Sequence, residues 1–162
     1  MLIRRVLVFF LMFSSLSFSS TGHAVYTSVQ GRAGDVGLGL LIGVPAAISG
    51  KYWLQSDRFI DGALSWNSLD SGWFYVHSTY LWNRRDVLLI DDVKLDIYYG
   101  VGGAFYQNFD GDTHLGVRTP VGASYRWKNP SIEAFAELDL TVHLTPGLGI
   151  APGLGVGARY FF

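Results

Sequence analysis

Gly153-Leu154-Gly155-Val156-Gly157-Ala158-Arg159-Tyr160-Phe161-Phe162 closes the chain, and this stretch decides the fold. Side chains on a β-strand alternate between its two faces. One face of the predicted strand is therefore apolar, and the other carries glycines, one arginine and one aromatic ring. The apolar face suits lipid and the glycine-rich face suits a crowded interior, which is typical of the last strand of a membrane β-barrel.

Seven earlier segments show comparable alternation and are separated by residues that favour turns. We predict strands at about 34–44, 49–55, 59–67, 73–83, 92–106, 115–127, 131–143 and 152–162. No segment shows helical periodicity of similar strength. The predicted fold class is all-β: an eight-stranded antiparallel up-and-down transmembrane β-barrel with both chain ends periplasmic. Its outward loops fall near 45–49, 68–72, 107–114 and 144–151.

Composition agrees with a membrane barrel. Hydrophobic residues make up 49% of the 162 residues, yet no apolar run after the first two dozen residues is long enough for a spanning helix. Only helices and closed barrels satisfy every backbone polar group within lipid, so strands are the candidate membrane element. The absence of cysteine excludes disulfides and thiolate sites.

The first 24 residues have the pattern of a secretory signal peptide. Arg4 and Arg5 precede an apolar run, and small residues surround a cleavage position after Ala24. A transmembrane anchor is the alternative, but the apolar run is too short to span a bilayer. Residues 25–162 then form one domain. Removal of the two arginines leaves ten basic against 13 acidic residues, which argues against nucleic acid as a partner.

Charged residues occupy the face that is opposite the apolar one. The predicted interior set contains five bases and five acids: Lys51, Asp61, Lys94, Asp96, Arg118, Arg126, Glu133, Glu137, Asp139 and Arg159. Unpaired ions in a dry interior are costly, so balanced charges are expected in a filled eight-stranded barrel. We expect Arg159 to pair with Glu133 or Glu137. The alternative is that these residues cover the solvated outside of a soluble barrel.

Aromatic residues fall near the predicted strand ends, where membrane barrels carry interfacial girdles. With periplasmic ends, an inner girdle would contain Trp53, Trp82, Trp127 and Phe162, and an outer girdle would contain Trp66, Trp73 and Phe105.

The pattern from about residue 34 to the end resembles the small eight-stranded outer-membrane barrels of Gram-negative bacteria, the OmpA-transmembrane-domain and OmpX type. The segments 50–54, 95–103, 115–122 and 155–162 are similar to a family of short, uncharacterised outer-membrane proteins. That resemblance implies a fold and a location. It also implies that Val156, Tyr160 and Phe162 form a signal for the barrel-assembly machinery.

Catalytic and metal sites find little support. His77 and Ser78 are neighbours on a strand and point to opposite faces, so they cannot form a lipase-like pair. The Asn108–Asp112 loop lacks the spacing of a calcium loop. His114 with Asp112 is a conceivable metal pair, but nothing else supports it. We expect no cofactor, no metal and no enzymatic activity.

The leading functional expectation is a monomeric outer-membrane barrel with a plugged polar lumen and a structural or surface-interaction role. Three alternatives remain at this point: a narrow pore for small solutes, a lipid-modifying outer-membrane enzyme, and a soluble periplasmic barrel that carries a ligand.

Overall fold

The computed structural model describes residues 25–43, 45–67 and 72–162. The predicted signal peptide and part of one predicted loop lie outside these residues. The strands are β1 (Tyr26–Thr27), β2 (Val36–Gly43), β3 (Ala47–Gln55), β4 (Arg58–Asn67), β5 (Trp73–Ile90), β6 (Val93–Asn108), β7 (Thr113–Arg126), β8 (Ile132–His143) and β9 (Gly149–Phe161). The eight strand positions predicted from the sequence are therefore all occupied by strands.

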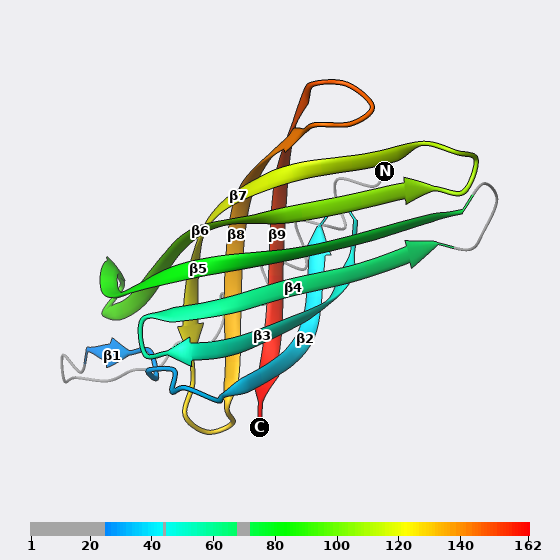
Figure 1. The fold of residues 1–162 in the computed structure, drawn as a ribbon. Coiled ribbons are helices and arrows are strands. Elements are labelled where there is room, and N and C mark those ends of the chain that lie inside the picture. The colour runs from blue at the N-terminus through cyan, green and yellow to red at the C-terminus, as the bar shows by residue number, and fades with distance from the viewer. Residues whose placement is uncertain (1–24, 44, 68–71) are drawn as a thin grey trace, which may run out of the picture.

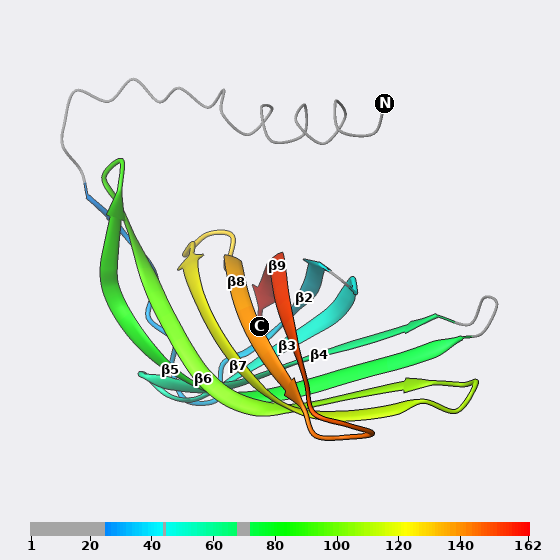
Figure 2. The same ribbon diagram turned by 90° about the horizontal axis from the view of Figure 1, so that it is seen from above.

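Strands β2 to β9 form a closed antiparallel ring (Figures 1 and 2). Each strand pairs with the next along the chain, and β9 pairs with β2 from Gly37↔Phe161 to Gly43↔Gly155. The all-β class and the eight antiparallel strands are thus confirmed. The short β1 is an addition that the sequence did not predict, and it pairs parallel to β6.

The ring has two different ends, which we name here. The termini end carries β1, the β3–β4, β5–β6 and β7–β8 turns, and the C-terminus. The loop end carries the other four connections, of which the β6–β7 connection reaches to the right in Figure 1. No helix in the described part of the chain is long and apolar enough to cross a membrane.

Strands β5 and β6 are longer than predicted and form a hairpin that projects at the termini end (Figure 2). The polar run Arg84-Arg85-Asp86 resembled a strand end, but it forms an irregularity after which pairing resumes at Leu88↔Leu95. Positive φ angles at Asp91 and Asp92 close the hairpin, as a type I′ turn requires. The tip residues Val87–Ile90 are exposed.

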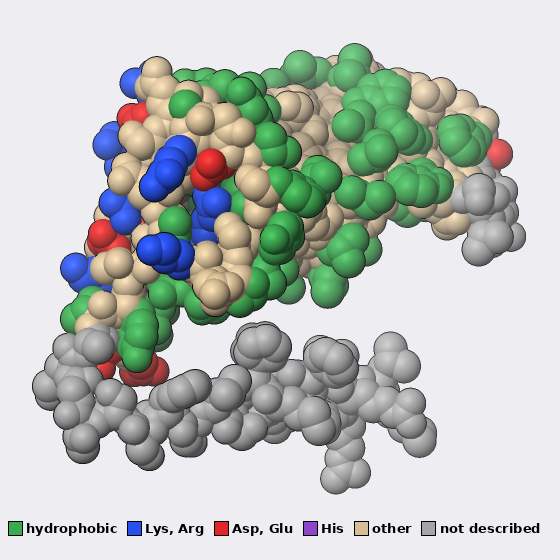
Figure 3. Space-filling model, turned by 90° about the horizontal axis from the view of Figure 1, so that it is seen from below, with side chains coloured by type: hydrophobic (Ala, Val, Ile, Leu, Met, Phe, Trp, Pro, Cys, Tyr) green, Lys and Arg blue, Asp and Glu red, His purple; other side chains and the backbone are tan. Residues whose placement is uncertain are grey.

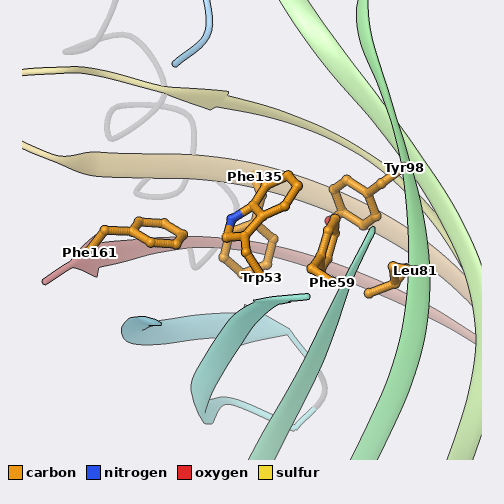
Figure 4. Packing of buried hydrophobic residues seen from close by; sticks show 6 residues of the cluster. All are labelled: Trp53, Phe59, Leu81, Tyr98, Phe135 and Phe161. Carbon is orange, nitrogen blue, oxygen red and sulfur yellow. The ribbon is translucent and has the colours of Figure 1, made fainter. Parts of the chain in front are cut away.

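An aromatic layer fills the interior near the termini end (Figure 4). It consists of six buried side chains, of which five are aromatic and one is a leucine: Trp53, Phe59, Leu81, Tyr98, Phe135 and Phe161. Phe59 lies between Trp53 and Tyr98, with ring centroids at 4.9 and 5.6 Å. Gly122 on β7 leaves the space that the Tyr98 ring occupies, because a Cβ there would overlap the ring.

The placement of Trp53 in this layer corrects its assignment to a girdle. Trp53 is 3% exposed and shares the inward face of β3 with Lys51 and Ser49. Trp73 also belongs to the interior, since it shares a face with Tyr75 and stacks on Tyr106 with centroids at 6.1 Å. In both cases the alternation of the strand decides the direction, and proximity to a strand end does not.

The outer surface carries a belt of exposed apolar side chains on seven of the eight ring strands, and the outward side chains of β5 between Phe74 and Trp82 are mostly half-buried. Figure 3 shows part of this belt. The belt includes Leu38, Leu40, Ile42, Ile48, Ile60, Leu64, Tyr99, Val101, Leu115, Val117, Val121, Leu138, Leu140, Leu154 and Val156. A folded chain that leaves so much continuous apolar area uncovered requires an apolar environment or partner.

Candidate functional site: the filled interior and its open cleft

The first ion cluster lies directly beside the aromatic layer and contains Lys51, Asp61, Glu133 and Arg159. Lys51 Nζ donates to Glu133 Oε1 at 2.6 Å, and Arg159 Nη2 donates to Asp61 Oδ2 at 3.1 Å. Arg159 Nη1 also lies 3.9 Å from Glu133 Oε2. All four residues are at most 3% exposed. Two cations and two anions therefore balance within a closed space.

The strand register explains why these four residues meet. Lys51 lies opposite Asp61 in the β3–β4 pair, and Glu133 lies opposite Arg159 in the β8–β9 pair. Closure of the ring through β2 brings the two pairs together across the interior. Ser49 completes the cluster by accepting a hydrogen bond of 2.9 Å from Arg159 Nε.

Cations of the interior also rest on aromatic rings. Lys51 Nζ lies 3.7 Å from the centroid of the Phe59 ring, and the Arg159 guanidinium lies 3.9 Å from that of Phe135. Cation–π contacts of desolvated groups are worth about 2 kcal/mol each. The aromatic layer and the first ion cluster therefore form one packed unit inside the ring.

A second ion cluster lies nearer the loop end and contains Arg118, Glu137 and Asp139. Arg118 Nη2 donates to both carboxylates, at 3.1 Å in the case of Asp139 Oδ2, and Arg118 Nη1 donates to Thr79 Oγ1 at 3.3 Å. Two carboxylates here share one guanidinium. The Oε2 atom of Glu137 is buried and has no hydrogen-bond partner.

Arg126 is held separately, at the termini end. Its Nη1 donates to Asp35 Oδ2 at 2.6 Å, and its guanidinium lies 3.8 Å from the Phe161 ring. Asp35 lies within the first predicted strand, about 34–44, on the same face as Gly37 and Gly39, but the predicted interior set did not include it. The alternation that assigns Gly37 to the interior was the available signal.

The segment 28–35, which carries Asp35, lines the termini end of the interior. Ser28 Oγ accepts a hydrogen bond of 3.1 Å from the Arg126 backbone N–H, and Gly34 N–H donates to the Trp53 carbonyl at 2.9 Å. The Trp53 ring lies so close to Gly31 that a Cβ there would overlap it. This segment thus adds a further layer over the aromatic layer.

Besides Arg126, two members of the predicted interior set lie outside both clusters. Asp96 is buried near the projecting hairpin, where its carboxylate accepts hydrogen bonds from Asn83 Nδ2 at 3.2 Å and from the Asp86 backbone N–H at 3.1 Å. Lys94 is half-buried and takes part in no ion pair with any residue that the structure describes. Both lie beside the projecting hairpin, and within the described residues neither forms an ion pair with a member of the two clusters.

The loop end of the interior is an open cleft of about 120 Å³. Rings from four adjacent strands form one wall. Tyr106 faces His114 at 5.8 Å between centroids, and His114 faces His143 at 5.5 Å. Small residues of β9, including Ala151 and Gly153, also line the cleft.

His77 and Ser78 do not form the pair that a hydrolase needs. His77 is buried and its Nδ1 lies 3.1 Å from the Tyr75 hydroxyl, whereas Ser78 points to the exposed outer face. Among residues 25–43, 45–67 and 72–162, no group of three or more His, Cys, Asp or Glu side chains is placed to hold a metal ion.

The three residues of the expected assembly signal share the outer face of β9 or its end. Val156 and Tyr160 are exposed there, and Phe162 follows the strand. The Tyr160 and Phe162 rings contact each other edge to face at 5.3 Å. Arg159, which precedes Tyr160, points into the interior. The two faces of β9 therefore carry the residues that strand alternation assigned to them.

The chain matches no protein-family model and no curated protein sequence.

Proposed function

We propose that this chain is an integral outer-membrane protein: an up-and-down transmembrane β-barrel of the small OmpA and OmpX kind, with a plugged interior and a structural or surface-interaction role. The observation that carries the proposal is the inversion of polarity. An apolar belt surrounds a ring whose interior holds seven charged side chains in two clusters. A soluble barrel has the opposite arrangement, with its apolar side chains inside.

The height of the belt supports a membrane span. On β5 the outward rings Phe74 and Trp82 are eight residues apart, and each has an aromatic neighbour on β6. The segment from Phe74 to Trp82 has nine residues, which falls within the roughly 9–11 that a tilted strand needs to cross a bilayer. Trp66 extends the loop-side row of rings, whereas Trp127 and Tyr160 extend the row at the termini end.

Cell fractionation tests this proposal. The protein should sediment with the outer membrane and migrate differently on unboiled and boiled gels, because folded membrane barrels resist detergent. Recovery in a soluble periplasmic extract would instead favour a soluble ligand-carrying barrel and would refute the proposal.

The direction of individual tryptophans provides a sharper test in vesicles that contain brominated lipid. The outward Trp66 and Trp127 should be quenched by the bromine atoms, and the inward Trp53 should not. Variants that retain one of the three tryptophans, with phenylalanine at the other four tryptophan positions, allow this comparison in the same fold.

The packed interior supports a barrel that does not conduct. The segment 28–35, the aromatic layer and the first ion cluster follow one another along the axis of the ring. We therefore expect no single-channel current from folded protein in planar bilayers. Reproducible conductance steps would favour a narrow pore for small solutes.

A further inference from the structure

The cleft at the loop end combines aromatic faces with excess negative charge. Tyr75, Tyr106, His114 and His143 surround it, and Asp139 forms part of its floor. The four residues with rings are only partly buried, so these rings remain accessible from the open end. Pockets with aromatic walls and a few convergent polar groups are the usual form of a small-molecule site.

The charge of the floor follows from the second ion cluster. Glu137 and Asp139 both bond to Arg118, so one negative charge is left without a positive partner. The first ion cluster, in contrast, is balanced. A buried excess charge is unfavourable, and a bound cation would offset it.

The distribution of basic residues also favours a cation over an anion at the loop end. Within the described residues, every Lys and Arg other than Arg118 lies level with the first ion cluster or nearer the termini end. The face shown in Figure 3 has its blue side chains gathered at one end. Asp110 and Asp112 lie in the β6–β7 loop, so anions are disfavoured at the loop end and cations are favoured.

From this geometry we propose that the cleft binds a small organic cation with a quaternary ammonium head group. Ring faces attract cations through the aromatic quadrupole, and cages of Tyr and Trp recognise methylated ammonium groups. The methyl groups contact Tyr75 and Tyr106, and the charge faces the Asp139 carboxylate. The volume of about 120 Å³ accommodates such a head group, whereas an oligosaccharide is too large.

Calorimetric titration of the purified full chain tests the proposal, in a detergent without cationic or zwitterionic head groups. The probe is choline, and the control ligand is 3,3-dimethyl-1-butanol, in which carbon replaces the charged nitrogen. We expect choline to bind at least about tenfold more tightly than its neutral analogue. Tetramethylammonium chloride should displace choline more effectively than sodium chloride at equal ionic strength.

Two substitutions locate the site. Tyr106→Leu should weaken choline binding by about fivefold or more, because it removes a ring face. Phe105→Leu is the matched control: it removes the neighbouring ring on the outer face and should leave binding unchanged. Asp139→Asn should also weaken binding. Unboiled gel mobility verifies that each variant is folded, and the competition with tetramethylammonium needs no variant.

Phosphocholine distinguishes the source of the ligand. Tighter binding of phosphocholine than of choline would indicate a zwitterionic lipid head group, and weaker binding would indicate a free cation. Folded protein that does not bind choline, that binds both isosteres equally, or that binds only Zn²⁺ would overturn the proposal. Such a result would leave the membrane proposal intact, since fractionation tests that separately.

Discussion

The two halves of the barrel interior contain the same types of residue, charged side chains and aromatic rings, but arrange them differently. Near the termini, charges are balanced, buried and stacked on rings. Near the loops, the rings of Tyr106, His114 and His143 are only partly buried and face an open cleft, and the charges below them do not balance. The comparison teaches that burial and charge balance, and not the types of residue, distinguish the termini end of the interior from its loop end.

The strongest way to break this contrast is to remove one charge from the first ion cluster. Glu133→Ala leaves Lys51 and Arg159 without their shared carboxylate in a buried site. We expect a loss of about 3–5 kcal/mol in the free energy of unfolding. Urea titration in detergent micelles, followed by tryptophan fluorescence, measures it.

Asp57→Ala is the control for that variant, because Asp57 pairs with Arg58 on the exposed surface. Exposed pairs contribute about 0–1 kcal/mol. Similar losses for the two variants would show that the interior is hydrated and that the first ion cluster is not a closed unit.

The aromatic layer should be nearly as sensitive. Phe59 is fully buried and contacts Trp53, Tyr98 and the Lys51 ammonium. Phe59→Ala should cost about 3–4 kcal/mol in the same titration, since it opens a cavity and removes a cation–π contact. Phe109→Ala, at an exposed loop position, should have little effect, and an equal loss at both positions would contradict the contrast.

A double substitution separates charge pairing from packing. Lys51→Met combined with Glu133→Leu replaces a buried ion pair with apolar side chains of similar size. Such replacements are often close to neutral, so the double variant should be more stable than Glu133→Ala. A double-mutant cycle over the unchanged protein, Lys51→Met, Glu133→Leu and the double variant measures the coupling between the two side chains. Additive losses would mean that Lys51 and Glu133 do not depend on each other.

The smallest effect is expected at the cleft. His143 is partly buried, its ring contacts that of His114, and its strand partner on β9 is the small residue Gly149. His143→Ala should change the free energy of unfolding by less than about 0.5 kcal/mol. A loss of several kcal/mol would show that the loop end is packed as tightly as the termini end.

Strand alternation predicted most of the architecture and the buried face of most of the predicted interior charges. Parity assigns each residue to a face, and this was sufficient for Arg118, Glu137 and Arg159. Parity also assigned Asp96 to the buried face of β6, but it did not predict that Asp96 and Lys94 lie apart from the two ion clusters, beside the projecting hairpin. A polar run that looked like a strand end was instead an irregularity within β5.

The partners inside the ring were harder to predict than the faces. The sequence suggested that Arg159 pairs with Glu133 or Glu137, and the structure places it beside Asp61 and Glu133. Asp61 is 98 residues away, and that contact exists only because the ring closes. The cleft was missed for a similar reason, since its rings belong to four strands whose relative stagger cannot be read from one segment.

The pairing of β2 with β9 has a consequence for how the chain folds. Their paired residues are 112 to 124 positions apart in the chain, so their contact bears the largest loop-closure entropy among the strand pairs and should form last. Until then, two unpaired edges with apolar outer faces coexist, and such edges invite association between chains. Correct folding therefore requires that the edge of β9 stays free of other chains until β2 pairs with it. Association between chains competes most strongly with this final step.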